Sequence, residues 1–297
     1  MESRKKLKTH FCSPKLWTNK KQQEWFAQKQ QMDRDLYVAR QLQQSLLPRS
    51  IGDALCESEE PYYFAKPHYK SQAVYVSGFY NPCEALGGDL YDVFTTTDDR
   101  HLVLSMVDVS GHGVAASLIT AMSKAAIARL CHQTQSPGEI LAILNQEIQA
   151  IIHTGDYLTA WIGFFDQKTQ VLTYARGGHP MPLLYRRESQ QLETLAEGGM
   201  ILGWLADQQY DNTQVQMEPG DALLLYTDGA SEMQNKAGEM FGVEQLQKGL
   251  RSACENVQTN SPVRLDELVL NLSDFSQGAA IGDDVSLLLL EVAKKCN

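Results

Sequence analysis

Four segments of the chain each place an aspartate beside glycine at the edge of an apolar run. They are Gly87-Gly88-Asp89, Val107-Asp108-Val109-Ser110-Gly111, Tyr226-Thr227-Asp228-Gly229 and Gly282-Asp283-Asp284. A carboxylate at the end of a strand is held by rigid backbone, and an adjacent glycine lets a metal ion, water or phosphate approach the main chain closely. One Asp-Gly pair is usually only a turn. Four in the same setting predict a shared site.

Carboxylates crowded into one site would repel each other and raise one another's pKa. Divalent cations remove that cost, because the positive charge favours the ionised carboxylate. A ligand set made of oxygen, without paired Cys or His, favours the hard ions Mg²⁺ or Mn²⁺ over Zn²⁺. Two such ions would activate a water molecule for in-line attack on phosphorus. No cysteine is followed six residues later by arginine, as a cysteine-phosphatase loop requires.

At this point the sequence resembles a known family. The segments GGDLYD, VDVSGHG, TDGASE and IGDDVSLL are similar, in this order, to the motifs of the PPM-type metal-dependent protein serine/threonine phosphatases, and most of all to their SpoIIE/RsbU-like bacterial branch. Further matches are ARQLQQSLLP at 39–48, ARGGHPMPLL at 175–184 and GGMILGW at 198–204. The resemblance covers residues 36–292 and implies a four-layer αββα sandwich with two metals between its sheets.

The resemblance also implies roles for individual residues. Asp108 would bridge both metals, and the backbone carbonyl of Val109 would be the ligand beside it. Asp89 would bind the second metal directly or through water. Asp108 and Asp89 are therefore the expected catalytic residues, acting through the water that the cations activate.

The remaining metal positions follow from the last two motifs. Asp228 and Asp283 match the two aspartates that hold the first metal, and Asp284 is the alternative to Asp283. The sequence alone leaves open which of these two neighbours points inward. Asp92, three residues after Asp89, is expected to support the ligands.

Two histidines in glycine-rich turns are candidates for a general acid that protonates the leaving group. His112 is the stronger candidate and His179 the weaker, and for each the alternative is a hydrogen bond to the backbone of its own turn. The family often has Asn-Ala-Gly-His where this chain has Arg176-Gly177-Gly178-His179. The family role of the first position therefore does not carry over to Arg176.

The first 50 residues are expected to form a basic leader and a linker helix, and residues 51–297 the phosphatase domain. Residues 22–48 have no Gly or Pro before Pro48 and are rich in helix-favouring residues. Their heptad-like seam is Met32, Leu36, Ala39, Gln43 and Leu46. This spacing is compatible with a helix packed on its own domain, or with a short coiled coil that makes a homodimer through residues 22–48.

The rest of the chain has the pattern of an α+β fold, with helices layered over two packed sheets. Alternating apolar residues predict strands at 74–80, 90–96, 102–108, 159–166, 171–176, 182–187, 212–217, 221–227 and 285–292. Helices are expected at 114–132, 137–152, 243–254 and 262–276, with Pro137 in a first turn capped by Ser136. Residues 166–170 and 218–220 are expected to be tight turns between antiparallel partners.

Charge and cysteine usage restrict the class of protein. The chain has a net charge of −10, and residues 1–50 hold 11 basic against 4 acidic residues, so a leader of +7 precedes a body of −17. This balance argues against a general nucleic-acid binder. The six cysteines are scattered, without a zinc pattern or disulfide framework. The basic N-terminus lacks the apolar stretch of a signal peptide, and no membrane span is expected, so a cytoplasmic location is predicted.

The resemblance implies that the substrate is a phosphoserine or phosphothreonine on a partner protein, such as a STAS-type anti-sigma-factor antagonist in a partner-switching pathway. The main alternative is a catalytically inactive phosphatase fold that serves as a binding or scaffold module. A second alternative is a dinucleotide-binding turn, because Gly111 to Ala116 fits the pattern GxGxxA. Such a turn needs an acidic residue about 20 positions later, and position 132 is His.

Overall fold

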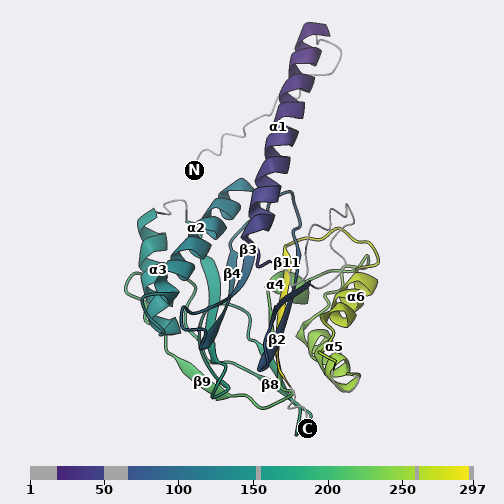
Figure 1. The fold of residues 1–297 in the computed structure, drawn as a ribbon. Coiled ribbons are helices and arrows are strands. Elements are labelled where there is room, and N and C mark those ends of the chain that lie inside the picture. The colour runs from purple at the N-terminus through teal and green to yellow at the C-terminus, as the bar shows by residue number, and fades with distance from the viewer. Residues whose placement is uncertain (1–18, 50–65, 152–154, 258–260, 294–297) are drawn as a thin grey trace, which may run out of the picture.

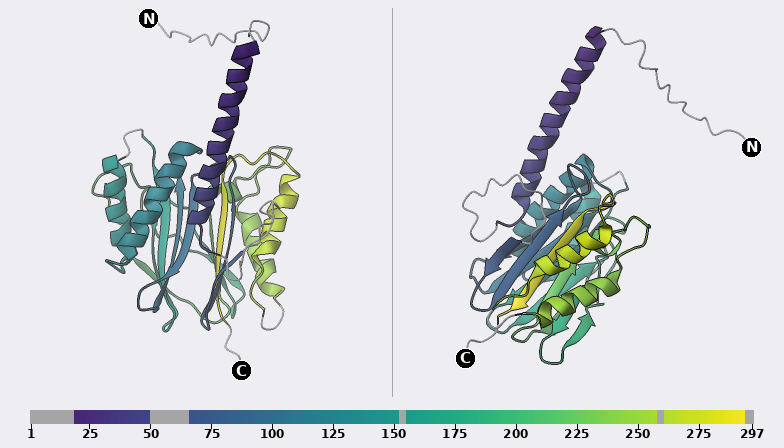
Figure 2. Two further views of the ribbon diagram at one scale, coloured as in Figure 1. Left: turned by 45° about the horizontal axis from the view of Figure 1, so that its top comes forward. Right: turned by 90° about the vertical axis from the view of Figure 1, so that its right-hand side faces the viewer.

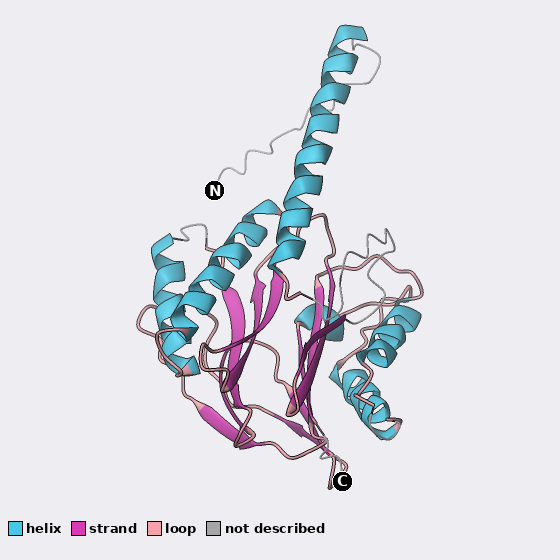
Figure 3. Cartoon of the chain, viewed as in Figure 1, coloured by secondary structure: helices cyan, strands magenta, loops and turns pink. Residues whose placement is uncertain are grey.

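Two antiparallel sheets pack face to face, with helices on both outer faces (Figure 1, Figure 3). The computed structural model describes residues 19–49, 66–151, 155–257 and 261–293. One sheet has the order β1 (Lys66–Lys70), β2 (Val74–Asn81), β11 (Val285–Val292), β10 (Ala222–Tyr226), β7 (Leu183–Arg186) and β8 (Gln191–Thr194). The other has the order β3 (Asp89–Thr95), β4 (His101–Val109), β5 (Leu158–Asp166), β6 (Val171–Gly177) and β9 (Thr213–Gln216).

The helices complete the four layers. They are α1 (Asn19–Leu46), α2 (Val114–Cys131), α3 (Pro137–Ile151), the single turn α4 (Asp228–Ser231), α5 (Val243–Glu255) and α6 (Leu265–Ser276). Helices α2 and α3 cover the five-stranded sheet, and α5 and α6 cover the six-stranded sheet (Figure 1). Helix α1 projects beyond the end of the sandwich in both views of Figure 2. This arrangement confirms the predicted αββα sandwich with an N-terminal helix.

The alternation of side chains along β4 explains how one strand serves two cores. Leu102, Leu104 and Met106 belong to the core between the sheets, whereas Val103 and Val107 pack under α2 and α3. Successive side chains of a strand point to opposite faces. Asp108 therefore continues the inward-facing series and lies between the sheets at the end of β4.

The predicted elements match the observed ones closely, with three additions and one correction. Strand β1 was not among the expected strands, β8 is mostly exposed, and α4 is too short for helical periodicity. The expectation that residues 218–220 join antiparallel partners was wrong, because β9 pairs with β6 and β10 pairs with β7 and β11. The turn instead carries the chain from one sheet to the other. Glu139 N donates to Ser136 Oγ, which confirms the predicted cap of α3.

Within the described residues, every pairing between two of the named strands is antiparallel. A dinucleotide-binding turn of the kind suggested by Gly111 to Ala116 belongs to a parallel βαβ unit. The chain instead passes from β4 into α2 and then α3 before it returns in antiparallel β5. This topology removes the structural context that the dinucleotide interpretation needs.

Helix α2 is the one helix in the described part of the chain that is long and apolar enough to cross a membrane by length and composition. Several of its side chains lie in the core beneath it, among them Ala116, Ile119, Ile127 and Leu130. A helix that packs against a sheet in this way needs the same apolar composition.

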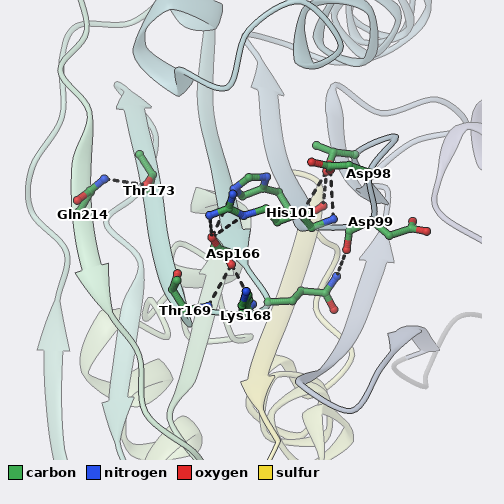
Figure 4. Close-up of polar contacts among 11 residues, drawn as sticks. Asp98, Asp99, His101, Asp166, Lys168, Thr169, Thr173 and Gln214 are labelled. Atoms are coloured by element: carbon green, nitrogen blue, oxygen red, sulfur yellow. Dashed lines mark hydrogen bonds and ion pairs between the residues drawn. The ribbon is translucent and has the colours of Figure 1, made fainter.

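A polar network closes the end of the five-stranded sheet opposite Asp108 (Figure 4). The carboxylate of Asp166 accepts hydrogen bonds from the backbone N–H groups of Lys168 and Thr169 and from the guanidinium of Arg100. Burial alone would raise the pKa of Asp166, but these bonds outweigh it and lower the pKa to about 2. The network fixes the β5–β6 turn and leaves the other end of the sandwich to the aspartate cluster.

Candidate metal centre

Asp89 and Asp108 face each other across neighbouring strands. They are register partners where β3 begins and β4 ends. Directly opposite side chains in an antiparallel pair have Cβ atoms about 4.5–5.5 Å apart, and like charges there are destabilising. Since Asp108 faces the space between the sheets, its cross-strand partner Asp89 does too. The sequence therefore places two carboxylates where only a cation or a proton can relieve their repulsion.

The carboxylate of Asp89 is held by two hydroxyl groups from the opposite sheet. Thr227 Oγ1 and Ser286 Oγ donate to Asp89 Oδ2 at 2.7 and 2.8 Å. Asp89 is only 3% exposed. Burial, together with the charges of Asp108 and Asp284, raises its pKa well above the usual range, and the two hydroxyl bonds only partly offset this effect. The buried carboxylate thus has two oriented hydroxyl donors on one oxygen and negatively charged neighbours in Asp108 and Asp284.

A second hydrogen-bonded chain supports Asp108. Its register partner on β5 is Thr159, whose hydroxyl bonds to the Asp108 carboxylate and also lies 2.8 Å from His179 Nδ1. Burial is the largest cause of the raised pKa of Asp108, to about 7, followed by the charges of Asp228, Asp283 and Asp284. These causes show that carboxylates from two distant segments, 226–229 and 282–284, converge on Asp108.

Asp228 and Asp283 lie at the more open side of the cluster. Asp228 is the first residue of α4, directly after β10, and Asp283 is exposed in the loop before β11. The pKa of Asp228 is raised by burial, then by Asp283 and Glu232. An exposed Asp283 carboxylate close to Asp228 can be recruited by a cation without losing buried partners.

Asp284 has a different environment from its neighbour. It is 2% exposed, and its carboxylate accepts hydrogen bonds from the backbone N–H groups of Cys83 at 2.8 Å, Gly88 at 2.5 Å and Asp89 at 3.4 Å. Both oxygens therefore already have partners on the segment that precedes β3. This arrangement makes Asp284 a clamp on the Gly87-Gly88-Asp89 segment.

Glycine is required where these segments meet. A Cβ on Gly88 would lie 2.6 Å from the carbonyl oxygen of Val109, and a Cβ on Gly229 would collide with the backbone carbonyl of Asp284. The sequence analysis expected these glycines to admit a metal ion, water or phosphate, whereas in the structure protein backbone fills the space beside Gly88 and Gly229. The same contact places the Val109 carbonyl beside the segment that carries Asp89.

The donor set fits hard divalent cations. Asp89, Asp108, Asp228 and Asp283 supply carboxylate oxygens, and the raised pKa of the first three shows that the folded chain holds them against their mutual repulsion. Oxygen-rich sites of this kind suit Mg²⁺ or Mn²⁺. The Cys83 thiol also lies close, with its sulfur and oxygens of Asp283 and Asp284 all within 4.8 Å of one another.

The two histidines have different environments. His112 is exposed in the turn before α2, and its Nδ1 lies 3.2 Å from Glu84 Oε2. His179 is buried, and burial followed by the nearby charge of Arg176 lowers its pKa to about 3. His179 is thus neutral at working pH and holds the Thr159 hydroxyl beside Asp108. It has no proton to give as an imidazolium.

Two further positions clarify the sequence analysis. Asp92 pairs with Lys124 of α2, on the face of β3 opposite Asp89, so it anchors α2 and is not a neighbour of the ligands. Arg176 donates to the carbonyl oxygens of His179, Ala196 and Glu197. It ties the turn after β6 to the 196–199 loop, which gives this departure from the family motif a structural role.

Three residues of the site were not predicted from the sequence. They are Thr159, Thr227 and Ser286, which bond to the buried carboxylates. For two of them the sequence offers a clue, which is their position next to an aspartate motif: Thr227 directly precedes Asp228, and Ser286 lies two residues after Asp284. Polar residues inside otherwise apolar strands at this end of the sheets could have marked them.

Comparison with known proteins identifies the family at the level of sequence. The family model described as Stage II sporulation protein E (SpoIIE) matches residues 98–293. Phosphoserine phosphatase RsbU of Bacillus subtilis (strain 168) is 25% identical over 222 residues, covering 74% of this chain and 64% of RsbU. Phosphoserine phosphatase RsbP of the same organism is 27% identical over 163 residues, covering 54% of this chain and 40% of RsbP. The chain spans less than two thirds of the length of each relative.

Solved structures agree at the level of the fold. The SiaA-PP2C domain of Pseudomonas aeruginosa superposes with a TM-score of 0.70 at 20% identity, over 89% of this chain and 98% of that one. The catalytic domain of the serine/threonine phosphatase PstP, in complex with 2 manganese ions, has a TM-score of 0.53 at 16% identity, over 75% of this chain and 99% of that one. Since the family model also covers well over half of the sequence, the chain belongs to the SpoIIE family, and it has the fold of the PP2C domain.

Proposed function

We propose that the protein removes phosphate from phosphoserine or phosphothreonine on a partner protein, using two divalent cations, Mn²⁺ or Mg²⁺. The observation that carries the proposal is the buried, like-charged pair of Asp89 and Asp108, with Asp228 and Asp283 converging on it. A folded protein rarely keeps such carboxylates together unless a cation or a function compensates their repulsion.

In this proposal Asp108 would be a ligand of both cations, together with Asp89 and the backbone carbonyl of Val109. Asp228 and Asp283 would supply the remaining carboxylate ligands, because Asp284 already accepts three backbone hydrogen bonds. When bound, the cations lower the pKa of water and neutralise charge on the phosphoryl oxygens. The chain's own contribution is to orient the carboxylates: Thr227 and Ser286 fix Asp89. Exposed His112 is the proposed general acid.

The proposed substrate is a phosphorylated STAS-type anti-sigma-factor antagonist in a partner-switching pathway. Two relatives named phosphoserine phosphatase support the phosphoserine class. A similar solved structure from Mycobacterium tuberculosis joins RsbU and RsbW domains in one protein. Mass spectrometry of phosphoproteins retained by an Asp108→Asn variant would identify the substrate, and retention of no phosphoprotein would contradict this proposal.

Hydrolysis of an aryl phosphate with added Mn²⁺ tests the proposed chemistry directly. We expect turnover that a chelator abolishes and that Mn²⁺ restores, because the carboxylates alone cannot activate water. Absence of chelator-sensitive turnover at every pH from about 6 to 9 would instead favour the inactive scaffold. Intact aspartates at all the matched positions argue against the scaffold.

Cys83→Ser is expected to retain activity within about twofold of the unmodified protein, since hard cations prefer oxygen ligands. Burial, followed by the charge of Asp284, raises the pKa of the Cys83 thiol to about 12, so the sulfur stays protonated beside the carboxylates. The comparison is kcat for both proteins at saturating Mn²⁺. Loss of most activity in the serine variant would show that the thiol takes part.

We further propose a cytoplasmic protein in which residues 51–297 form the phosphatase domain and residues 1–50 a leader and linker helix that pairs with a second copy. The apolar side chains Trp25, Phe26, Met32, Tyr37, Val38 and Leu42 are exposed on α1, which supports pairing. Leu42→Glu should convert a dimer into a monomer in sedimentation velocity, whereas Gln31→Glu, also exposed on α1, should not. A monomeric unmodified protein would contradict this part of the proposal.

A further inference from the structure

Gln43 is a buried amide on a helix whose other described side chains are exposed or half-buried. Its side chain bonds to both backbone polar groups of one residue: Gln43 Nε2 donates to the carbonyl oxygen of Gly87 at 2.6 Å, and the Gly87 N–H donates to Gln43 Oε1 at 3.1 Å. Gln43 is 7% exposed, whereas α1 is exposed from Lys21 to Asp35. It is the polar position that interrupts the apolar seam of the helix, and this contact accounts for it.

The Gly87 peptide belongs to the segment that carries Asp89. The next residue, Gly88, donates its N–H to Asp284, and its carbonyl oxygen accepts hydrogen bonds from Thr120 Oγ1 of α2 at 2.7 Å and from Val109 N at 3.2 Å. The segment is tightly packed, because a Cβ on Gly87 would collide with the Asp284 carboxylate and the Tyr80 hydroxyl. A displacement of the Gly87 peptide is therefore passed to Asp89 instead of being absorbed locally.

The residues that hold Gly87 and Gly88 in place come from different parts of the fold. Asp284, Thr120 and Val109 belong to the sheets and to a helix packed on them, whereas Gln43 belongs to α1, whose N-terminal part projects from the sandwich (Figure 2). Gln43 is thus the contact through which the projecting helix holds the backbone that precedes Asp89.

We propose that Gln43 is a positioning residue for the metal centre: it fixes the Gly87 peptide, and through it Asp89, in the arrangement that binds divalent cations. This inference rests on the proposed metal-dependent function. Gln43→Met keeps the length and volume of the side chain and removes both hydrogen bonds. Gln41→Met makes the same substitution two residues earlier, at an exposed position whose side chain hydrogen-bonds to Tyr37 within α1.

Hydrogen exchange of the metal-free protein gives a readout that does not depend on activity. In Gln43→Met we expect the amides of Gly87, Gly88 and Asp89 to exchange roughly tenfold faster, the effect of losing one or two buried hydrogen bonds. Amides of β11 outside this contact should be unchanged. Gln41→Met should match the unmodified protein everywhere.

Titration with Mn²⁺, followed by calorimetry, tests the consequence for binding. The dissociation constant should rise roughly tenfold in Gln43→Met, while kcat at saturating Mn²⁺ stays close to that of the unmodified protein. Gln43→Asn, whose amide is one methylene too short to span to Gly87, should behave like Gln43→Met and serves if the methionine variant does not fold.

Unchanged exchange at Gly87–Asp89, or unchanged Mn²⁺ affinity, in a folded Gln43 variant would overturn the inference. So would faster exchange spread evenly over both sheets, or failure of both variants to fold, since either result indicates a contribution to stability alone. If the unmodified protein binds no Mn²⁺, the proposed function fails, but local exchange in the metal-free protein still shows whether Gln43 holds the segment.

Discussion

Asp108→Asn should lower phosphatase turnover by at least about a thousandfold, equivalent to about 4 kcal/mol of transition-state stabilisation. Asp108 lies at the centre of the cluster, with Asp89 across the strand and Asp228, Asp283 and Asp284 as charged neighbours. The amide keeps the size of the side chain but removes the charge that both cations are proposed to share. The measurement is kcat with an aryl phosphate at saturating Mn²⁺.

The same variant should fold, and its stability should show why the site needs a cation. In the metal-free protein the Asp108 pKa is raised to about 7, above the unfolded value of about 3.9. Between these values the folded state binds the extra proton, so its stability falls as pH rises, by up to about 1.4 kcal/mol per pH unit. Above the folded pKa the loss is complete.

Asparagine has no such titration. With chelator present, thermal unfolding of the unmodified protein should therefore occur at lower temperature at pH 8 than at pH 5, and Asp108→Asn should reduce this difference. A variant that unfolds at both pH values would show that Asp108 is needed for the fold, and retained turnover would remove it from the mechanism.

Asp283→Asn and Asp284→Asn should separate metal binding from backbone support. Asp283 is a proposed metal ligand, so its amide variant should lose most Mn²⁺ affinity and turnover. Because the side chain is exposed, the free energy of unfolding should change little. Asp284 accepts backbone hydrogen bonds on both carboxylate oxygens, and asparagine offers only one acceptor oxygen. Its variant should unfold more easily by about 1–3 kcal/mol, the cost of an unsatisfied buried N–H.

The comparison is made by Mn²⁺ titration and by denaturant unfolding of the metal-free proteins. Asp274→Asn, an exposed change on α6, serves as the control for loss of one negative charge. If Asp284→Asn binds no Mn²⁺ but keeps full stability, while Asp283→Asn binds normally, the roles of the two neighbours are the reverse of those proposed here.

The sequence predicted the sheets well because apolar alternation determines which face of a strand is buried. In β4, Leu102, Leu104 and Met106 alternate with Val103 and Val107, and the same period places Asp108 between the sheets. The fold itself was predicted because the aspartate motifs resemble, in their order, those of a known family. The transfer of the chain between sheets at residues 218–220 was not predictable, because a local turn does not specify its partners.

Long-range polar contacts were the least predictable part of the site. Gln43 interrupts the seam of α1 and looks like a weak position of a coiled coil, yet it bonds to Gly87. The partners that separate Asp284 from Asp283 are N–H groups about 200 residues earlier in the chain, at Cys83 and Gly88. Neither periodicity nor composition reports such contacts, because they form only when distant segments pack together.

A crystal structure of the protein grown with Mn²⁺, with data collected at the manganese absorption edge, tests the central claim most directly. The account predicts two anomalous peaks between the sheets, with Asp108 in contact with both ions, Asp89 beside one, and Asp228 with Asp283 beside the other. Absence of anomalous density there, with these aspartate side chains directed away from one another, would contradict it.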